Sequence, residues 1–499
     1  MKMVKGFMLC SAAGFLAMGG AQAADLPVKA KAVEYVKICS LYGAGFYYIP
    51  GTDTCIKIGG YLRADTTFNG GIQDAPAWNG DLGQKNRYRD QFTSRARMAL
   101  TVDTRTATEY GVVRTFGQGD FTFDAPNNTK VGTAAPAGAG SAFAAEFLFI
   151  QFAGFTFGKS ASAFATPWHG YPGNNSSFLL GGHDTVTGVN NIQYTAQFGN
   201  GVSGTIGLDE PTVYWRTKIG YLIPGSVDAV GTTPNAYGGT AAPDIVGNIR
   251  IDQAWGVFQL SGAGHLNNAT YNALSTAAAP LVGSELSGHP ESKWGGSVMA
   301  ALQIKNIPTG PGDDIKMDAT YAVGNTKNVI STSSGSPNFA MFGSGDGASY
   351  QSVGFGNTTD SMYVPGSGLE LTTAYGFRGA FNHNWDPYWS TSLFGSYSVV
   401  KHTDTAKAFY CAAYVASNTG AKSLDFSCNP DFNVSQLGVV TRWTPVKNLT
   451  FSAEVQWFHL DQKFTGTSVL TPAAPKPTAV YSFKDQDTVS FQVRAQRNF

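Results

Sequence analysis

The sequence predicts an all-β fold, a closed transmembrane antiparallel β-barrel of about sixteen strands. Three observations predict it. Apolar and polar residues alternate with a period of two in many segments, as in strands with one apolar and one polar face. Short and long connections between these segments also alternate along the chain. The composition combines only 14% charged residues with 60 glycines and 13% aromatic residues.

The composition argues against several other classes. Charged residues reach about 25% in an average soluble protein, well above the value here. The mean hydropathy of −0.11 does not suit a bundle of membrane helices. Beyond the N-terminal segment, no stretch offers the ~18 consecutive apolar residues of a spanning helix. The formal net charge is zero, which argues against nucleic acid as a partner.

The first 23 residues are typical of an export signal. Lys2 and Lys5 precede an apolar core, and "AQA" at 21–23 fits a cleavage site. We therefore expect residues 1–23 to be a signal peptide and the mature chain to begin near Ala24.

Four cysteines follow this segment in two close pairs, Cys39 with Cys55 and Cys411 with Cys428. An even number in an exported chain favours two local disulfides. Metal binding is the alternative, but the chain has no C-x-x-C motif and no His at ligand spacing. We interpret residues 24–54 as a periplasmic lead-in with a disulfide hairpin, followed by a barrel over 55–499.

The alternating segments recur from the first predicted strand to the last residue. Near 55–67, Ile56, Ile58 and Leu62 share one face, with polar residues opposite. Segments near 95–104, 191–198, 314–324 and 449–457 repeat this scheme. At the end, 487–499 places an apolar set opposite a polar one. The apolar set is Val489, Phe491, Val493, Ala495 and Phe499.

The connections sort into two kinds. Seven short turns are predicted near 105–108, 153–154, 199–201, 252–253, 306–312, 386–387 and 445–448. Eight long loops are predicted near 68–91, 118–143, 160–190, 210–243, 267–291, 325–368, 402–432 and 463–486. Strict alternation of this kind implies about sixteen strands, with both termini of the chain on the short-turn side.

A soluble β-sandwich is not expected to have its short connections at one end and its long connections at the other. An outer-membrane barrel does have this arrangement, with short periplasmic turns and long extracellular loops. A barrel in lipid must also close, because an open backbone edge is too costly there. The last strand must therefore pair with the first. We expect Phe499 to lie in the interfacial aromatic girdle and to serve as an assembly signal for the barrel-insertion machinery.

Motifs of enzymes are missing. "GFTFGKS" at 154–160 is one residue too short for a phosphate loop and lies in a predicted hairpin. No G-x-S-x-G or H-E-x-x-H occurs, and the seven histidines are scattered. We expect no enzyme activity, no cofactor and no metal site. A barrel esterase without a motif is the remaining alternative.

Three stretches resemble the general porins of alphaproteobacteria: "ADLPVKAKAVEYVKICSLYGAGFYYIPGTDTCIKIGGYLR" (24–63), "TRTATEYGVVRTF" (104–116) and "FAGFTFGKS" (152–160). The other loops match only in length and composition. The resemblance implies a homotrimer of sixteen-stranded barrels in the Gram-negative outer membrane. Each barrel would be a water-filled pore for passive diffusion of small hydrophilic solutes and ions. The third long loop, about 160–190, would fold inward and narrow the lumen.

A set of charged residues is the candidate constriction. Four arginines fall on successive early strands, on the polar face by parity, and carboxylates lie beside them. The predicted pore-lining residues are Arg63, Asp65, Arg95, Arg97, Asp103, Arg114 and Asp184. Fixed charges across a narrow gap sort small ions. The facing loop is usually acidic in the resembled family, but here it holds only Asp184, which favours a neutral to mildly anion-preferring pore. The alternative interpretation is that these charged residues are solvated side chains of the lumen wall with no special role.

Two other functions stay open. One is a substrate-selective channel, for instance for sugars, in which aromatic residues of the third loop form a stacking slide: Phe164, Trp168, Tyr171 and Phe178. The other is a secreted soluble β-sheet adhesin or lectin. The diffusion pore and the substrate-selective channel both require the lipid bilayer as partner, whereas the soluble adhesin does not.

Overall fold

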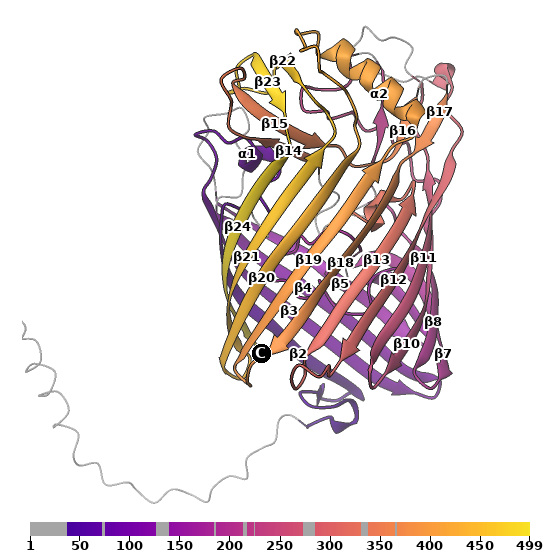
Figure 1. Ribbon diagram of the computed structural model, residues 1–499. Helices are drawn as coiled ribbons and strands as arrows, with labels where there is room; N and C mark the ends of the chain where they lie inside the picture. The colour runs from indigo at the N-terminus through magenta and orange to yellow at the C-terminus, as the bar shows by residue number, and fades with distance from the viewer. Residues whose placement is uncertain are drawn as a thin grey trace, which may run out of the picture.

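The computed structural model describes residues 37–71, 75–125, 139–183, 186–212, 217–223, 225–272, 285–330, 338–364 and 367–499. Sixteen antiparallel strands within these ranges form a closed barrel (Figure 1). They are β2 (Thr54–Phe68), β3 (Phe92–Thr108), β4 (Gly111–Ala125), β5 (Gly140–Phe152), β6 (Phe155–Ser160), β7 (Val189–Gly199), β8 (Val202–Asp209), β10 (Asp244–Gln253), β11 (Gly256–Asn267), β12 (Lys293–Lys305), β13 (Asp314–Val323), β18 (Thr373–Asn384), β19 (Trp389–Lys401), β20 (Phe432–Val446), β21 (Leu449–Gln462) and β24 (Gln486–Asn498). The predicted fold class is confirmed.

The barrel closes through a seam between its first and last strands. β2 pairs with β24 from Tyr61, opposite Asn498, to Phe68, opposite Phe491. Beyond β24, the amide of Phe499 donates to the carbonyl of Gly60 at 3.0 Å, and the amide of Gly60 donates back at 3.2 Å. The closed sheet satisfies the backbone groups that an edge would leave open.

The period-2 pattern determines which side chains face outward. Along β24, Val489, Phe491 and Val493 are exposed on the outer surface, whereas Gln492 and Arg494 are buried on the inner side. The same alternation recurs along the other strands, so the outside is apolar and the lumen polar. An apolar outer band is what a surrounding bilayer requires.

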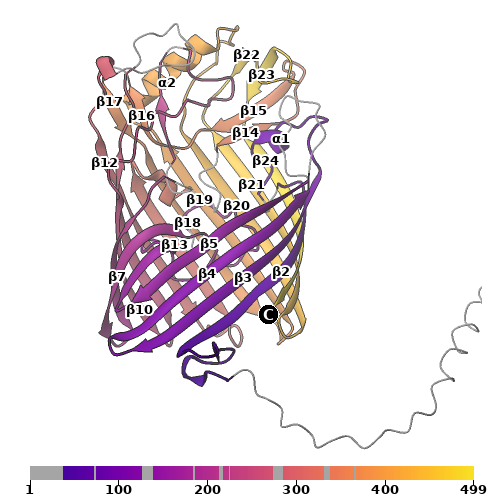
Figure 2. The same ribbon diagram turned by 180° about the vertical axis from the view of Figure 1, so that it is seen from behind.

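Short turns and long loops lie at opposite ends. The C-terminus lies at the turn end (Figures 1 and 2). The same end holds η1 (Ser40–Tyr42) and β1 (Tyr47–Tyr48), which pairs with the start of β2. The turns include Ala153–Gly154 and Asn200–Gly201, whose residues adopt left-handed backbone conformations that tight hairpins require.

The long loops contain structure of their own. They hold β9 (Lys218–Tyr221), β14 (Phe339–Phe342), β15 (Gln351–Gly356), β16 (Thr359–Val364), β17 (Gly368–Leu371), β22 (Thr467–Leu470), β23 (Ala479–Phe483), α1 (Gly80–Gly83), α2 (Asp404–Ser417), η3 (Glu285–Ser287) and η4 (Thr326–Asn328). Of the helices described, none has the length and apolar character to cross a membrane.

Six of these elements, β14, β15, β16, α2, β22 and β23, contribute to one hydrophobic core at the long-loop end. Val353 and Phe355 of β15, Tyr414 of α2 and Tyr481 of β23 pack together in it. β15 and β23 also pair in parallel, joining two loops far apart in sequence. We call this assembly the loop cap. The sequence pattern indicates these segments only as loops, because their apolar residues find partners in other loops rather than in a neighbouring strand.

Candidate functional site

One long loop turns into the barrel and contacts the opposite wall. The chain leaves β6 after Ser160 and returns at Val189; we call residues 161–188 the inward segment. The amide of Asn175 donates to Oε2 of Glu454 at 2.5 Å. Gln436 receives a bond from the amide of Leu180 at 2.8 Å and donates to the carbonyl of Phe178 at 2.6 Å. Since these partners lie on β20 and β21, the inward segment crosses the lumen.

Three arginines of the barrel wall hold the inward segment in place. Arg378 is fully buried, pairs with Asp318 at 2.9 Å and donates to the carbonyl of Leu179 at 3.1 Å. Arg442 donates to Oδ1 of Asn175 at 3.3 Å, and Arg494 donates to the carbonyl of Asn175 at 3.0 Å. Charge-assisted hydrogen bonds are strong when they are buried. These bonds therefore hold the inward segment in a defined position against the barrel wall.

The aromatic side chains of the inward segment face the wall. Phe164 is 1% exposed and packs with Met299 of β12. Tyr171 packs beside Phe394 of β19, and Phe178 packs against Trp78 with ring centres 5.7 Å apart. Trp168 is 7% exposed. The rings of Phe164, Tyr171 and Phe178 are therefore occupied in packing, which argues against the stacking slide of the alternative sugar channel.

Three of the four predicted arginines, Arg63, Arg95 and Arg97, lie on a charged inner wall made by β24, β2, β3 and β4. Their partners are aspartates of the same wall. Arg95 pairs with Asp124 at 2.8 Å, and Arg97 pairs with Asp120 at 2.8 Å. Arg63 pairs with Asp65 at 3.1 Å. We call Arg63, Asp65, Arg95, Arg97, Asp120, Asp124 and Arg494 the charged wall.

Asp65 is shared by two arginines, because Arg494 also pairs with it, at 2.5 Å. Since Arg494 bonds to Asn175 as well, the charged wall meets the inward segment here. The charged wall holds four arginines against three aspartates. Within this set of seven residues the arginines therefore exceed the aspartates by one.

Asp103 and Arg114 lie elsewhere. Asp103 is shared by Arg114 at 3.0 Å and Arg105 at 3.1 Å. It lies six residues beyond Arg97 along β3, roughly 20 Å toward the turn end. Arg105 stacks there on Phe46 of the lead-in, with 4.9 Å to the ring centre. Arg114 is therefore placed near the periplasmic mouth and not beside the inward segment.

Other charged groups also lie near the inward segment, among them Glu454, which accepts from the amide of Asn175, and Arg442. Asp184 lies outside the described residues. Lys159 donates to the carbonyl of Ala145. Glu146 accepts a bond from Thr187 at 2.8 Å, and His183 is buried.

The sequence analysis did not name Asp120, Asp124, Glu146, Arg378 or Arg494 as site residues. A signal for two of them existed, since Asp120 and Asp124 share the parity of the inner face of β4. Their partners follow only from the register between strands.

Both predicted disulfides are present. Cys39–Cys55 staples the lead-in to the start of β2, and Cys411–Cys428 ties α2 to the end of its loop. Within the described residues, no group of three or more His, Cys, Asp or Glu could hold a metal ion.

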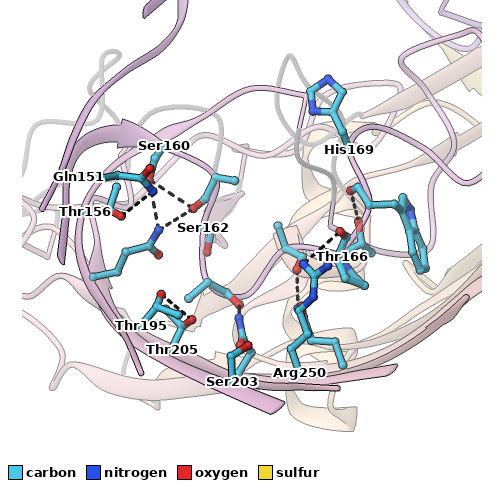
Figure 3. Close-up of a pocket in the computed structure, with 18 of the residues that line it drawn as sticks. Gln151, Thr156, Ser160, Ser162, Thr166, His169, Thr195, Ser203, Thr205 and Arg250 are labelled. Carbon is cyan, nitrogen blue, oxygen red and sulfur yellow. Dashed lines mark hydrogen bonds between the residues drawn. The ribbon is translucent and has the colours of Figure 1, made fainter. Parts of the chain in front are cut away.

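A recess lies beside the inward segment. It has a volume of about 690 Å³ and is lined by inner faces of β4–β8, β10 and β11 and by residues 161–169 (Figure 3). Its lining is mostly polar and uncharged, including Gln151, Thr156, Thr195 and Thr205. The lumen thus contains two different surfaces, the charged wall and this neutral recess.

A closed barrel with an apolar exterior, a polar lumen and an inward segment has the architecture of an outer-membrane pore protein. The porin subfamily matches residues 25–492, and the chain belongs to this family. The family is one of channels rather than enzymes, and it places the protein in the outer membrane of a Gram-negative cell.

Individual porins and one solved channel structure are similar to this chain. Porin Omp2b of Brucella suis is 34% identical over 261 residues, which are 51% of this chain and 64% of that protein. Porin Omp2b of Brucella abortus (strain 2308) is 35% identical over 258 residues, 51% of this chain and 63% of that protein. The match thus spans slightly less than two thirds of these relatives. The crystal structure of the outer membrane channel DcaP of Acinetobacter baumannii shares the fold, with a TM-score of 0.55 at 14% identity, over 91% of this chain and 99% of that one.

Proposed function

We propose that the protein is a pore for passive diffusion of small hydrophilic solutes and ions across the outer membrane. The observation that carries this proposal is the inward segment, which crosses a polar lumen enclosed by an apolar outer surface. Such a lumen offers water a continuous polar lining, and the crossing segment limits its width. No energy source is needed for this function.

We further propose a mild preference for anions. The charged wall holds one arginine more than aspartates, and it meets the inward segment at Arg494. Charges at a narrow, partly desolvated point act on passing ions more strongly than charges in open water.

Conductance of the refolded protein in planar bilayers tests both proposals. The pore should be ohmic, and its conductance should rise with salt concentration. In a salt gradient at low ionic strength the reversal potential should favour anions, and this preference should fade as salt screens the wall. Absence of conducting channels would refute the pore. A cation preference at low salt would refute the proposed effect of the charged wall.

We also propose a homotrimer, with the hairpin of β5 and β6 in the interface. Phe143, Leu148, Ile150 and Phe157 of this hairpin are all at least 43% exposed on the outer surface. Native mass measurement in mild detergent should give three chains. A monomer would contradict the proposal.

Residues 1–23 lie outside the described residues, and we propose that they are removed on export. N-terminal sequencing of the protein from membranes should begin near Ala24. A retained Met1 would refute cleavage.

A further inference from the structure

The recess is a well-defined cavity within the lumen. Its volume of about 690 Å³ falls within the range of roughly 300–1,000 Å³ that small-molecule sites occupy. Asn248 of β10 donates to the carbonyl of Ala163 at 2.6 Å, and Gln259 of β11 donates to the carbonyl of Ala165 at 2.7 Å. These bonds fix the inward segment as one side of the recess.

Amide and hydroxyl groups from neighbouring strands converge on the recess (Figure 3). Gln151 donates to Thr156 at 3.1 Å, and the hydroxyls of Thr195 and Thr205 are 3.0 Å apart. Within the part of the chain that the structure describes, Oε1 of Gln193 is buried and accepts no hydrogen bond. The amide of Gln193 lines the recess, and its Nε2 donates at 3.4 Å to the hydroxyl of Ser160 and at 3.4 Å to the carbonyl of Ala161.

Aromatic faces border the same space. Phe116 and Phe149 both line the recess and stack on each other with centres 5.3 Å apart. Aromatic rings offer flat apolar surface to the C–H faces of a ligand. The recess thus combines hydrogen-bonding groups with an apolar floor.

The recess carries little net charge. Among the described lining residues, Arg250 and Asp252 are the charged pair, and they neutralise each other at 2.7 Å. His169 also lines it. A charged solute would give up hydration here without gaining a counter-ion, whereas an uncharged one meets many groups able to replace its hydrogen bonds to water.

We propose that the recess is a binding subsite for uncharged polyhydroxylated solutes of mono- or disaccharide size. The proposal rests on the proposed pore function, because the solute reaches the recess through the lumen. It assigns recognition mainly to strand residues of the recess; of the four aromatic residues considered for a stacking slide, Trp168 is the one that lines it.

The test is the effect of neutral maltose on the ion current through single pores of the full-length mature protein. Maltose should reduce the current in a saturable way and add current noise. Gluconate and glucosamine, matched hydroxylated probes with a negative or positive charge, should be clearly weaker at equal concentration and ionic strength.

Substitution of the Gln193 amide, which lines the recess, locates the effect. Gln193→Leu should raise the half-blocking concentration of maltose roughly fivefold, the value of about one lost hydrogen bond. Phe149→Leu should weaken the block as well. The matched control is Gln492→Leu, which changes another buried inner-face amide with unpartnered atoms, but on β24, outside the recess. Its half-blocking concentration should equal that of the natural protein.

The outcomes separate the two proposals. Pores that never conduct would overturn the pore function itself. Pores that conduct normally but show no saturable maltose effect would overturn the subsite alone. An equal effect of the three probes would refute selection for uncharged solutes. An equal loss in Gln193→Leu and Gln492→Leu would place the interaction outside the recess.

Discussion

At the scale of single residues, the sharing of carboxylates decides where the lumen is charged. A guanidinium paired with its own aspartate contributes little field at a distance, because the pair is nearly neutral. Asp65 serves both Arg63 and Arg494, and Asp103 serves two arginines near the turn end. Each shared aspartate leaves one positive charge uncompensated.

Replacing Asp65 with Asn should increase anion preference. The substitution leaves Arg63 and Arg494 without a carboxylate beside the inward segment. A unit charge about 5 Å from a passing ion contributes roughly 3 kcal/mol at an effective dielectric near 20, before screening. The reversal potential in a low-salt gradient should therefore shift further toward anions.

The matched control is Asp103→Asn, which removes the same charge near the periplasmic mouth. It should shift the reversal potential less, because salt screens a wider opening more strongly. Equal shifts in the two variants would mean that the inward segment does not mark the narrowest point.

Lys476 should make the loop cap more stable as the pH rises above 8. It contacts Gln84 and Gln351 of two other loops, and its ammonium lies 4.1 Å from the ring centre of Phe342. Burial, with the nearby charge of Lys85, lowers the pKa of Lys476 to about 8. The unfolded lysine has a pKa near 10.4, so between these values the unfolded state binds more protons and stability increases with pH.

Limited proteolysis of the loops at pH 7.5 and pH 9.5 measures this effect, after correction for protease activity on an unstructured peptide. Cleavage should be slower at pH 9.5. Lys476→Met, which keeps most of the length but has no charge, should lose this pH dependence. The same dependence in Lys476→Met would assign it to other groups.

Sequence could indicate residues of the lumen but not their partners. Parity alone placed Arg63, Arg95 and Arg97 on polar faces. The pairing of Arg97 with Asp120 depends on the register between β3 and β4, which parity does not determine. The aromatic residues of the inward segment were open to two interpretations, since a loop ring can face water or pack against a wall.

At the scale of elements, strands and turns were predictable because each strand carries its own signal. The lipid outside and the water inside impose an alternation that is complete within about ten residues. The loop cap has no such local signal. In α2 the buried residues include Ala406, Tyr410 and Tyr414, and these pack against β15 and other loops. The N-cap by Thr403, which accepts from the amide of Ala406, is a local signal.

Removing the disulfide of α2 should loosen this helix while leaving the barrel intact. Cys411 and Cys428 are 17 residues apart, and a closed loop of this length stabilises by about 3 kcal/mol in the chain-entropy model. In the variant Cys411→Ser, Cys428→Ser, amides of α2 should exchange with solvent on the order of a hundredfold faster.

Hydrogen exchange resolved by peptide fragments gives the measurement. The matched variant Cys39→Ser, Cys55→Ser should affect the lead-in and leave α2 unchanged. Unchanged exchange in α2 after loss of its own disulfide would show that the loop cap alone holds the helix.

At the scale of the whole molecule, Phe499 should matter more for assembly than for stability. Its ring is 59% exposed on the outer surface, while its backbone completes the seam with Gly60. Phe499→Ala keeps these backbone bonds and removes only the ring. The amount of protein inserted in the outer membrane should fall several-fold, with little change in the thermal unfolding of the inserted protein.

Phe451→Ala is the control, because Phe451 is another outward aromatic residue, on β21 near the same end. It should insert at normal levels. Equal insertion of the two variants would exclude a signal role for the terminal ring.

The seam also has a consequence for the order of events during biogenesis. Tyr61 and Asn498 are neighbours in the sheet although almost the whole chain lies between them. A growing or partly exported chain cannot form this contact, so closure waits for complete translocation. Until then the nascent sheet has two free edges, each able to capture another strand. Contacts of such long sequence separation form slowly. The interval before closure is therefore when an escort is most needed, and the residues at the very end of the chain govern how it finishes.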